Sequence, residues 1–132
     1  MVRTEAGFWI VLGLMVLLFP VRFLLGVVLA AFIHEMGHIL AVGLTGGRIT
    51  SIRLHAFGAR IQAEPMEPGK GAICALAGPA AGALTVLAWH WFPELALAGL
   101  VQTGFNLLPI YPLDGGRAVR NICCKLREFG VQ

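Results

Sequence analysis

Apolar stretches separated by short polar connections constrain the fold of this chain more than any other feature of its sequence. They cover residues 6–19, 23–44, 71–92 and 95–113, and the third contains no Asp, Glu, Lys or Arg. A membrane-spanning helix needs about 20 predominantly apolar residues, so these stretches would occupy most of the 132-residue chain. The sequence therefore predicts an all-α polytopic membrane protein with about four transmembrane helices, the first of them short.

The composition argues against other classes of protein. Hydrophobic residues make up 58% and charged residues 13% of the chain, against about 45–50% and 25% in soluble domains. The net charge of +3 comes without a basic run or stripe, so we expect no nucleic-acid partner. Glu5 precedes the first stretch and Pro20-Val21-Arg22 follows it, which is unlike a cleaved signal peptide. We expect this stretch to be retained, as a separate span turning at Pro20 rather than as one kinked helix with the second stretch.

Positive charges indicate the orientation in the bilayer. The connection at residues 93–94 carries none, whereas the loop 45–70 and the C-terminal segment carry most of them, namely Arg48, Arg53, Arg60 and Lys70, then Arg117, Arg120, Lys125 and Arg127. Cytoplasmic loops are enriched in Lys and Arg, so four spans with both termini in the cytoplasm satisfy this pattern. We expect residues 1–132 to form a single membrane-embedded core.

Two further elements are expected on the cytoplasmic side. Residues 49–61 alternate loosely like two short strands around residues 55–58, which predicts a small β-hairpin within loop 45–70. Residues 117–129 place Val119, Ile122 and Leu126 on one side among basic residues, which predicts a short amphipathic helix.

The second stretch contains the sequence His34-Glu35-Met36-Gly37-His38. Residues four apart share one face of a helix, so both imidazoles can bind one Zn²⁺. Glu35 is then placed to act as general base on a metal-activated water, as in metalloproteases with this spacing. The pattern also occurs by chance on solvated helices, but ionisable residues inside a membrane are costly and are usually functional. We therefore predict one Zn²⁺ per chain.

Zinc held by two histidines needs a third protein ligand. Asp114, the only aspartate, lies at the cytoplasmic end of the fourth stretch, and the topology brings it to the depth of His34 and His38. His90 and Glu94 lie on the opposite side, and His55, Glu64 and Glu67 would reach the site only if the loop folds back. The alternative for Asp114 is a turn residue before two glycines. We expect Asp114 to be the third ligand.

Other residues near these positions are candidates for supporting roles. Pro109 and Pro112 cannot continue a helix, so we expect them, with Gly115, to shape an irregular segment that carries Asp114. Asn106 is a candidate oxyanion or substrate donor, or alternatively the donor of an inter-helix hydrogen bond. Gly78 and Gly82 are small residues four apart, which is typical of close helix packing.

Taken in order, His34-Glu35-x-x-His38, Gly78-x-x-x-Gly82 and Asn106-x-x-Pro109-x-x-Pro112-x-Asp114-Gly115 resemble the site-2 protease family of intramembrane zinc metalloproteases. The form Pro-Leu-Asp-Gly-Gly-Arg is most similar to the branch that contains the stage IV sporulation protease. These motifs span residues 34–117.

The resemblance implies zinc bound by His34, His38 and Asp114, with Glu35 as general base. The substrate would be a membrane protein or membrane-associated protein, cut in or near a transmembrane segment in a bacterial cytoplasmic or forespore membrane. Strands in residues 46–63 would dock an unwound substrate by strand addition.

This chain departs from that branch in length. Members are usually longer, with extra spans and often a nucleotide-binding domain, so we expect a minimal core, a natural miniature or a truncated form. The alternatives in function are a catalytically idle membrane scaffold and a zinc-binding membrane protein.

Overall fold

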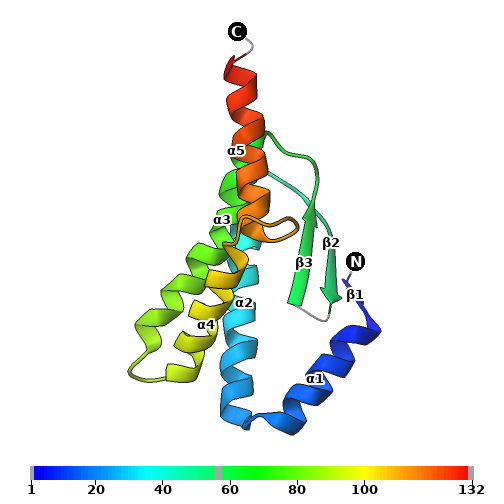
Figure 1. The fold of residues 1–132 in the computed structure, drawn as a ribbon. Helices are drawn as coiled ribbons and strands as arrows, with labels where there is room; N and C mark the ends of the chain where they lie inside the picture. Colours follow the sequence, from blue (N-terminus) through cyan, green and yellow to red (C-terminus); the bar gives the residue numbers. More distant parts are fainter. Residues whose placement is uncertain (1, 56–57, 131–132) are drawn as a thin grey trace.

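The computed structural model describes the backbone of residues 2–55 and 58–130 and the side chains of residues 4–54 and 61–130. The elements in chain order are β1 (Val2–Thr4), α1 (Ala6–Leu18), α2 (Val21–Leu44), β2 (Ile49–His55), β3 (Gly58–Ala63), α3 (Pro68–Ala83), the 3₁₀ helix η1 (Leu84–Ala88), α4 (Pro93–Asn106) and α5 (Asp114–Gly130). The described chain is mainly helical, with a small sheet beside the helices (Figure 1).

The first two apolar stretches form separate helices, as expected. Phe19 is extended, with φ −121° and ψ 147°, and Pro20 directly precedes α2. A residue before proline is disfavoured in the helical region, so α1 ends here. Instead of packing along α2, α1 diverges from it after this turn, and the sheet lies on the same side of α2 as α1 (Figure 1).

The helices pack through small residues. α2 contacts both α3 and α4, and α3 also contacts α5. A Cβ atom at Gly37 of α2 would lie 2.5 Å from the carbonyl oxygen of Ala77 in α3, and one at Gly26 would lie 2.8 Å from the backbone of Glu94 in α4. Only glycine allows these backbones to approach so closely, which is typical of helix packing in membranes.

The length of the helices bears on the predicted number of spans. Residues 21–44 and 68–88 form two helices that are long and apolar enough to cross a membrane. α1 and α4, with 13 and 14 residues, are each about 20 Å long, less than the roughly 30 Å of a bilayer core. The fourth predicted span is shorter than expected because α4 ends at Asn106, before Pro109 and Pro112. The count of four spans stays a prediction.

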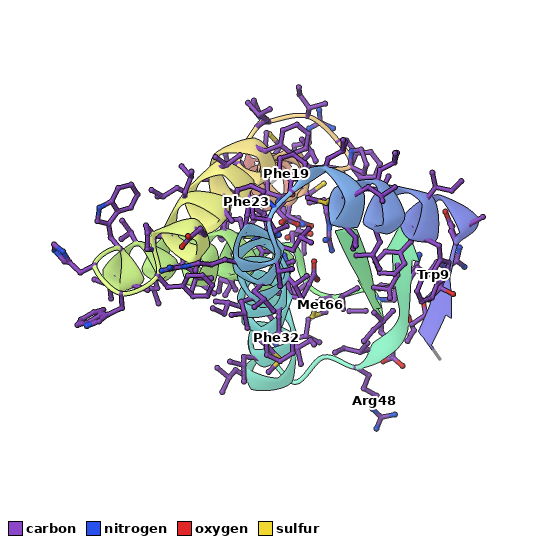
Figure 2. The ribbon with its side chains drawn as sticks, turned by 90° about the horizontal axis from the view of Figure 1, so that it is seen from below. Trp9, Phe19, Phe23, Phe32, Arg48 and Met66 are labelled. Atoms are coloured by element: carbon purple, nitrogen blue, oxygen red, sulfur yellow. The ribbon has the colours of Figure 1, made fainter. Side chains whose placement is uncertain are left out.

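The predicted hairpin is present, and the sheet has one strand more than expected. β2 and β3 pair antiparallel, and residues 56–57 between them lie outside the described residues. β1, at the start of the chain, pairs parallel to β2, with Val2 opposite Ile52. Met66 lies between α2 and the sheet, and Arg48 points away from the molecule (Figure 2). The N-terminal strand was missed because three residues are too short to show a periodic pattern.

The last helix begins earlier than the predicted residues 117–129. α5 starts at Asp114, so Asp114 does not project from irregular backbone but is the first residue of a helix that follows the irregular residues 107–113. The alternative interpretation of Asp114 as a turn residue before two glycines is therefore wrong. An aspartate is favourable at the positive end of a helix, and Gly115 and Gly116 allow the preceding segment to approach closely.

Candidate metal centre

Three side chains from two distant parts of the chain meet at one point. Oδ2 of Asp114 lies 3.0 Å from Nε2 of His34 and 3.1 Å from Nε2 of His38. The two Nε2 atoms are 3.2 Å apart. Among the described residues, these three form the one group of ligand-type side chains whose donor atoms lie within 4.8 Å of one another. The structure thus brings together the residues that the sequence singled out as ligands.

The cluster is shielded from solvent. His34, His38 and Asp114 are 2%, 7% and 6% exposed. Burial alone would raise the pKa of the Asp114 carboxyl, but its hydrogen bonds to the two imidazoles outweigh burial and hold that pKa below its usual range. The carboxyl group is therefore an anion, as a metal ligand must be.

The donor set and its spacing fit zinc. Two imidazole nitrogens and one carboxylate oxygen match the ligands of catalytic zinc sites, which keep a fourth position open. With metal–ligand distances of about 2.0–2.2 Å, tetrahedral geometry separates the donor atoms by about 3.3–3.5 Å. The observed separations of 3.0–3.2 Å come within a few tenths of an ångström of that value. No other side chain has to move to complete a three-ligand site.

The neighbouring backbone of α3 positions His38. Nδ1 of His38 donates a hydrogen bond to the carbonyl oxygen of Cys74 in α3, at 2.7 Å. With zinc bound, this bond would leave Nε2 of the same ring without a proton, so that its lone pair could bind the metal. Gly78 lies against the His38 ring, because the three atoms nearest to a Cβ placed there all belong to that imidazole. Gly78 therefore makes room for a ligand as well as for helix packing.

Asp114 is positioned by the segment before it. A Cβ atom at Gly115 would overlap the backbone of Leu107, and one at Gly116 would lie 2.5 Å from the backbone of Ile110. The two glycines therefore let residues 107–113 fold back over the start of α5. Arg117 stays near the carboxylate, with its guanidinium 3.5 Å from Oδ1 of Asp114.

Glu35 lines the same cavity as the cluster. It follows His34 on α2 and is half-buried. The cavity has a volume of about 730 Å³ and is bounded by α2, by the end of β3 and the segment after it, and by α4 and α5. Ile61, Glu64 and Met66 contribute to its wall from the sheet side.

Of the remaining candidate residues, some line the cavity and others lie away from it. Asn106 lines the cavity, and its amide nitrogen donates a hydrogen bond to the carbonyl oxygen of Gln102 in its own helix, at 3.0 Å. Its role toward an oxyanion stays a prediction. Glu94 pairs with Arg22 at 3.0 Å, at the opposite end of α2 from the cluster. Pro109 is exposed outside the cavity, whereas Pro112 lines it.

Sequence reasoning missed two contributors near the histidines. The Cys74 carbonyl group accepts the hydrogen bond of His38, and a backbone group carries no sequence signal. Thr103 of α4 is buried, with its hydroxyl oxygen close to Gly82. A threonine inside a mostly apolar helix was the available signal for the second contributor.

Comparisons with known proteins agree with this arrangement. No family model matches the chain. Stage IV sporulation protein FB of Bacillus subtilis is 32% identical over 137 residues, covering 92% of this chain and 47% of that protein. A Synechocystis protein whose name assigns it as a zinc metalloprotease, sll0528, is 33% identical over 105 residues, covering 67% of this chain and 28% of that protein. The chain thus spans less than half the length of either relative.

A solved structure has the same fold. The site-2 protease of Methanocaldococcus jannaschii matches with a TM-score of 0.73 and 24% identity, over 92% of this chain and 66% of that one. Together with the two relatives, this match confirms the resemblance indicated by the motifs. The chain belongs to the site-2 protease family, in the branch of stage IV sporulation protein FB.

Proposed function

We propose that this chain is an intramembrane zinc endopeptidase that hydrolyses a peptide bond in or near a transmembrane segment of another membrane protein. The buried cluster of His34, His38 and Asp114 is the observation that carries the proposal. A carboxylate and two imidazoles are costly to bury together among apolar helices without a function. The family relation supports the same activity.

His34, His38 and Asp114 would hold the zinc. Zinc bound there would act as a Lewis acid that polarises the substrate carbonyl and lowers the pKa of water toward 7. Glu35, next to His34 in the cavity wall, would take a proton from the attacking water and pass it to the leaving nitrogen as the C–N bond breaks. Asn106, from the opposite wall, would donate a hydrogen bond to the substrate.

The sheet would hold the substrate in an extended form. Within the described residues the strand order is β1-β2-β3, so β3 is an edge strand whose outer backbone groups pair with no other strand. Ile61 and Ala63 of β3 line the cavity. An unwound substrate segment adding to this edge would therefore pass along the metal site, because strand addition satisfies its backbone hydrogen bonds.

The protein would lie in a bacterial cytoplasmic membrane, with both termini and the metal site toward the cytoplasm. In Figure 1, α5 and the C-terminus lie at the same end of the molecule as the start of α3, and the α3–α4 connection lies at the other end. This arrangement agrees with the distribution of basic residues between loop 45–70 and the residues after Arg117. Residues 1–132 would act as one catalytic core.

Glu35→Gln is the decisive variant for this proposal. We expect it to bind zinc as the unchanged chain does and to lose cleavage by at least the 10²–10⁴-fold typical of general-base removal. Zinc content is measured on protein purified in detergent, and cleavage by immunoblot after co-expression with a panel of tagged single-span membrane proteins. Glu128→Gln, at an exposed glutamate of α5, is the matched control and should cleave normally.

Two results would contradict the proposal. Cleavage that survives in Glu35→Gln would remove Glu35 as the base. A chain that binds zinc and cleaves none of the panel, and whose Glu35→Gln variant captures no cross-linked partner, would instead be a zinc-binding scaffold.

A further inference from the structure

The two proposed histidine ligands differ in how their second ring nitrogen is satisfied. Nδ1 of His38 has an acceptor in the Cys74 carbonyl group. Nδ1 of His34 is buried and has no hydrogen-bond partner among the described residues. For Nε2 of His34 to bind a metal, Nδ1 must carry the proton, and a buried N–H group requires an acceptor.

A small polar space adjoins this nitrogen. A Cβ atom placed on Gly82 of α3 would have three polar atoms as its nearest neighbours. They are the hydroxyl oxygen of Thr103 at 2.6 Å, Nδ1 of His34 at 3.5 Å and the carbonyl oxygen of Gly99 at 3.7 Å. Because position 82 carries no side chain, two acceptor atoms and the unpartnered nitrogen share the space next to the α3 backbone.

The Thr103 hydroxyl has acceptor capacity to spare. It donates its proton to the carbonyl oxygen of Pro79, at 3.3 Å, and is 8% exposed. A hydroxyl oxygen has two lone pairs beyond its one donor, so it can accept a bond while donating another. A buried water is stable where it has two to four polar partners, and this space provides three.

We propose that Thr103 is a positioning residue for His34. One water beside Gly82 accepts the Nδ1–H group of His34. The same water donates to the hydroxyl oxygen of Thr103 and to the carbonyl oxygen of Gly99. With zinc bound, this link leaves Nε2 of His34 without a proton and free to bind the metal, as the Cys74 carbonyl group does for His38. The inference rests on the proposed function, since the link matters only if Nε2 binds zinc.

Thr85 offers a matched control in the same helix interface. It is also a buried threonine, 4% exposed, but its hydroxyl donates to the carbonyl oxygen of Gly82, at 2.7 Å. Within the described residues, no hydrogen bond joins the Thr85 hydroxyl to either histidine. Removing this hydroxyl changes packing to a similar degree without touching the link to His34.

The test compares zinc affinity in Thr103→Val, Thr103→Ser and Thr85→Val variants of the 132-residue chain, measured by competition with a chromophoric chelator. Valine keeps the shape of threonine and removes the acceptor, so we expect Thr103→Val to bind zinc about 10–100-fold more weakly, as for other lost partners of metal ligands. Thr103→Ser should restore affinity to within about threefold of the unchanged chain, and Thr85→Val should match it.

Gly82→Ala provides a second variant, because its methyl carbon would lie 2.6 Å from the Thr103 hydroxyl oxygen and would displace it. We expect a similar loss of zinc affinity. Wild-type affinity in Thr103→Val or in Gly82→Ala would overturn the inference, and so would an equal loss in Thr103→Ser or Thr85→Val, which would indicate packing alone. Tight zinc binding by the unchanged chain alongside such a result leaves the proposed function standing, whereas a chain that binds no zinc refutes both.

Discussion

At the scale of residues, the site consists of three side chains that can each bind a metal and whose donor atoms must lie close together. His34 and His38 share a face of one helix, so their spacing follows from local geometry. Asp114 is 76 residues beyond His38, and elimination among the acidic residues was the argument for it. In the structure its carboxylate oxygen lies within 3.1 Å of both imidazoles. Asn106 instead donates its amide hydrogen bond within its own helix.

The identity of the third ligand can be tested directly. Removing the carboxylate with Asp114→Ala should weaken zinc binding by more than the 10–100-fold expected for an outer partner. The comparison is His55→Ala, which removes the histidine of loop 45–70 and should leave zinc affinity unchanged. Zinc stoichiometry and affinity on purified protein check both. Loss in His55→Ala with retention in Asp114→Ala would show that the elimination was wrong.

At the scale of elements, glycine placement decides how closely α3 can approach α2. Gly37 faces the backbone of Ala77, and Gly78 faces the His38 ring. The sequence indicated Gly78 and Gly82 as packing residues from their spacing alone. That they also border the two histidines could not be predicted, because spacing does not reveal which neighbour a small residue faces.

Gly78→Ala tests this arrangement. The added methyl group would overlap the His38 ring, so α3 or the ring must shift, and we expect both a lower melting temperature and weaker zinc binding. Gly43→Ala is the control, because no atom lies within 4 Å of a Cβ at that position. It should keep zinc affinity and stabilise α2 by roughly 0.5–1 kcal/mol. Thermal unfolding with and without zinc measures both, and equal behaviour of the two variants would contradict the contact.

At the scale of the whole molecule, the usual distribution of residues is inverted. The buried apolar residues are mostly small, such as Ala30, Ala75 and Ala96, and among the described residues no leucine, phenylalanine or tryptophan is buried. Large apolar side chains cover the surface instead, including Leu17, Leu44 and Trp91 at 80–88% exposure. A soluble protein rarely exposes so much contiguous apolar surface, whereas lipid would cover it.

The orientation in the membrane can be read by cysteine labelling. Cys123 and Cys124 are exposed on α5, and Cys74 is buried. A membrane-impermeant maleimide added to intact bacteria should leave Cys123 and Cys124 unlabelled until the membrane is permeabilised. In a cysteine-free background, His90→Cys, exposed near the α3–α4 connection, should react in intact cells. The reverse pattern would invert the proposed topology.

The sequence by itself determined the apolar stretches, the face shared by His34 and His38, and the irregular segment that contains Pro109 and Pro112. Each depends on residues within a few turns of one another, where helix geometry and the proline ring act locally. Only the tertiary structure decided that β1 joins the sheet, that α5 begins at Asp114, and that Thr103 lies beside Gly82 and His34. Those contacts depend on how closely separate elements approach, and backbone packing rather than local pattern sets that distance.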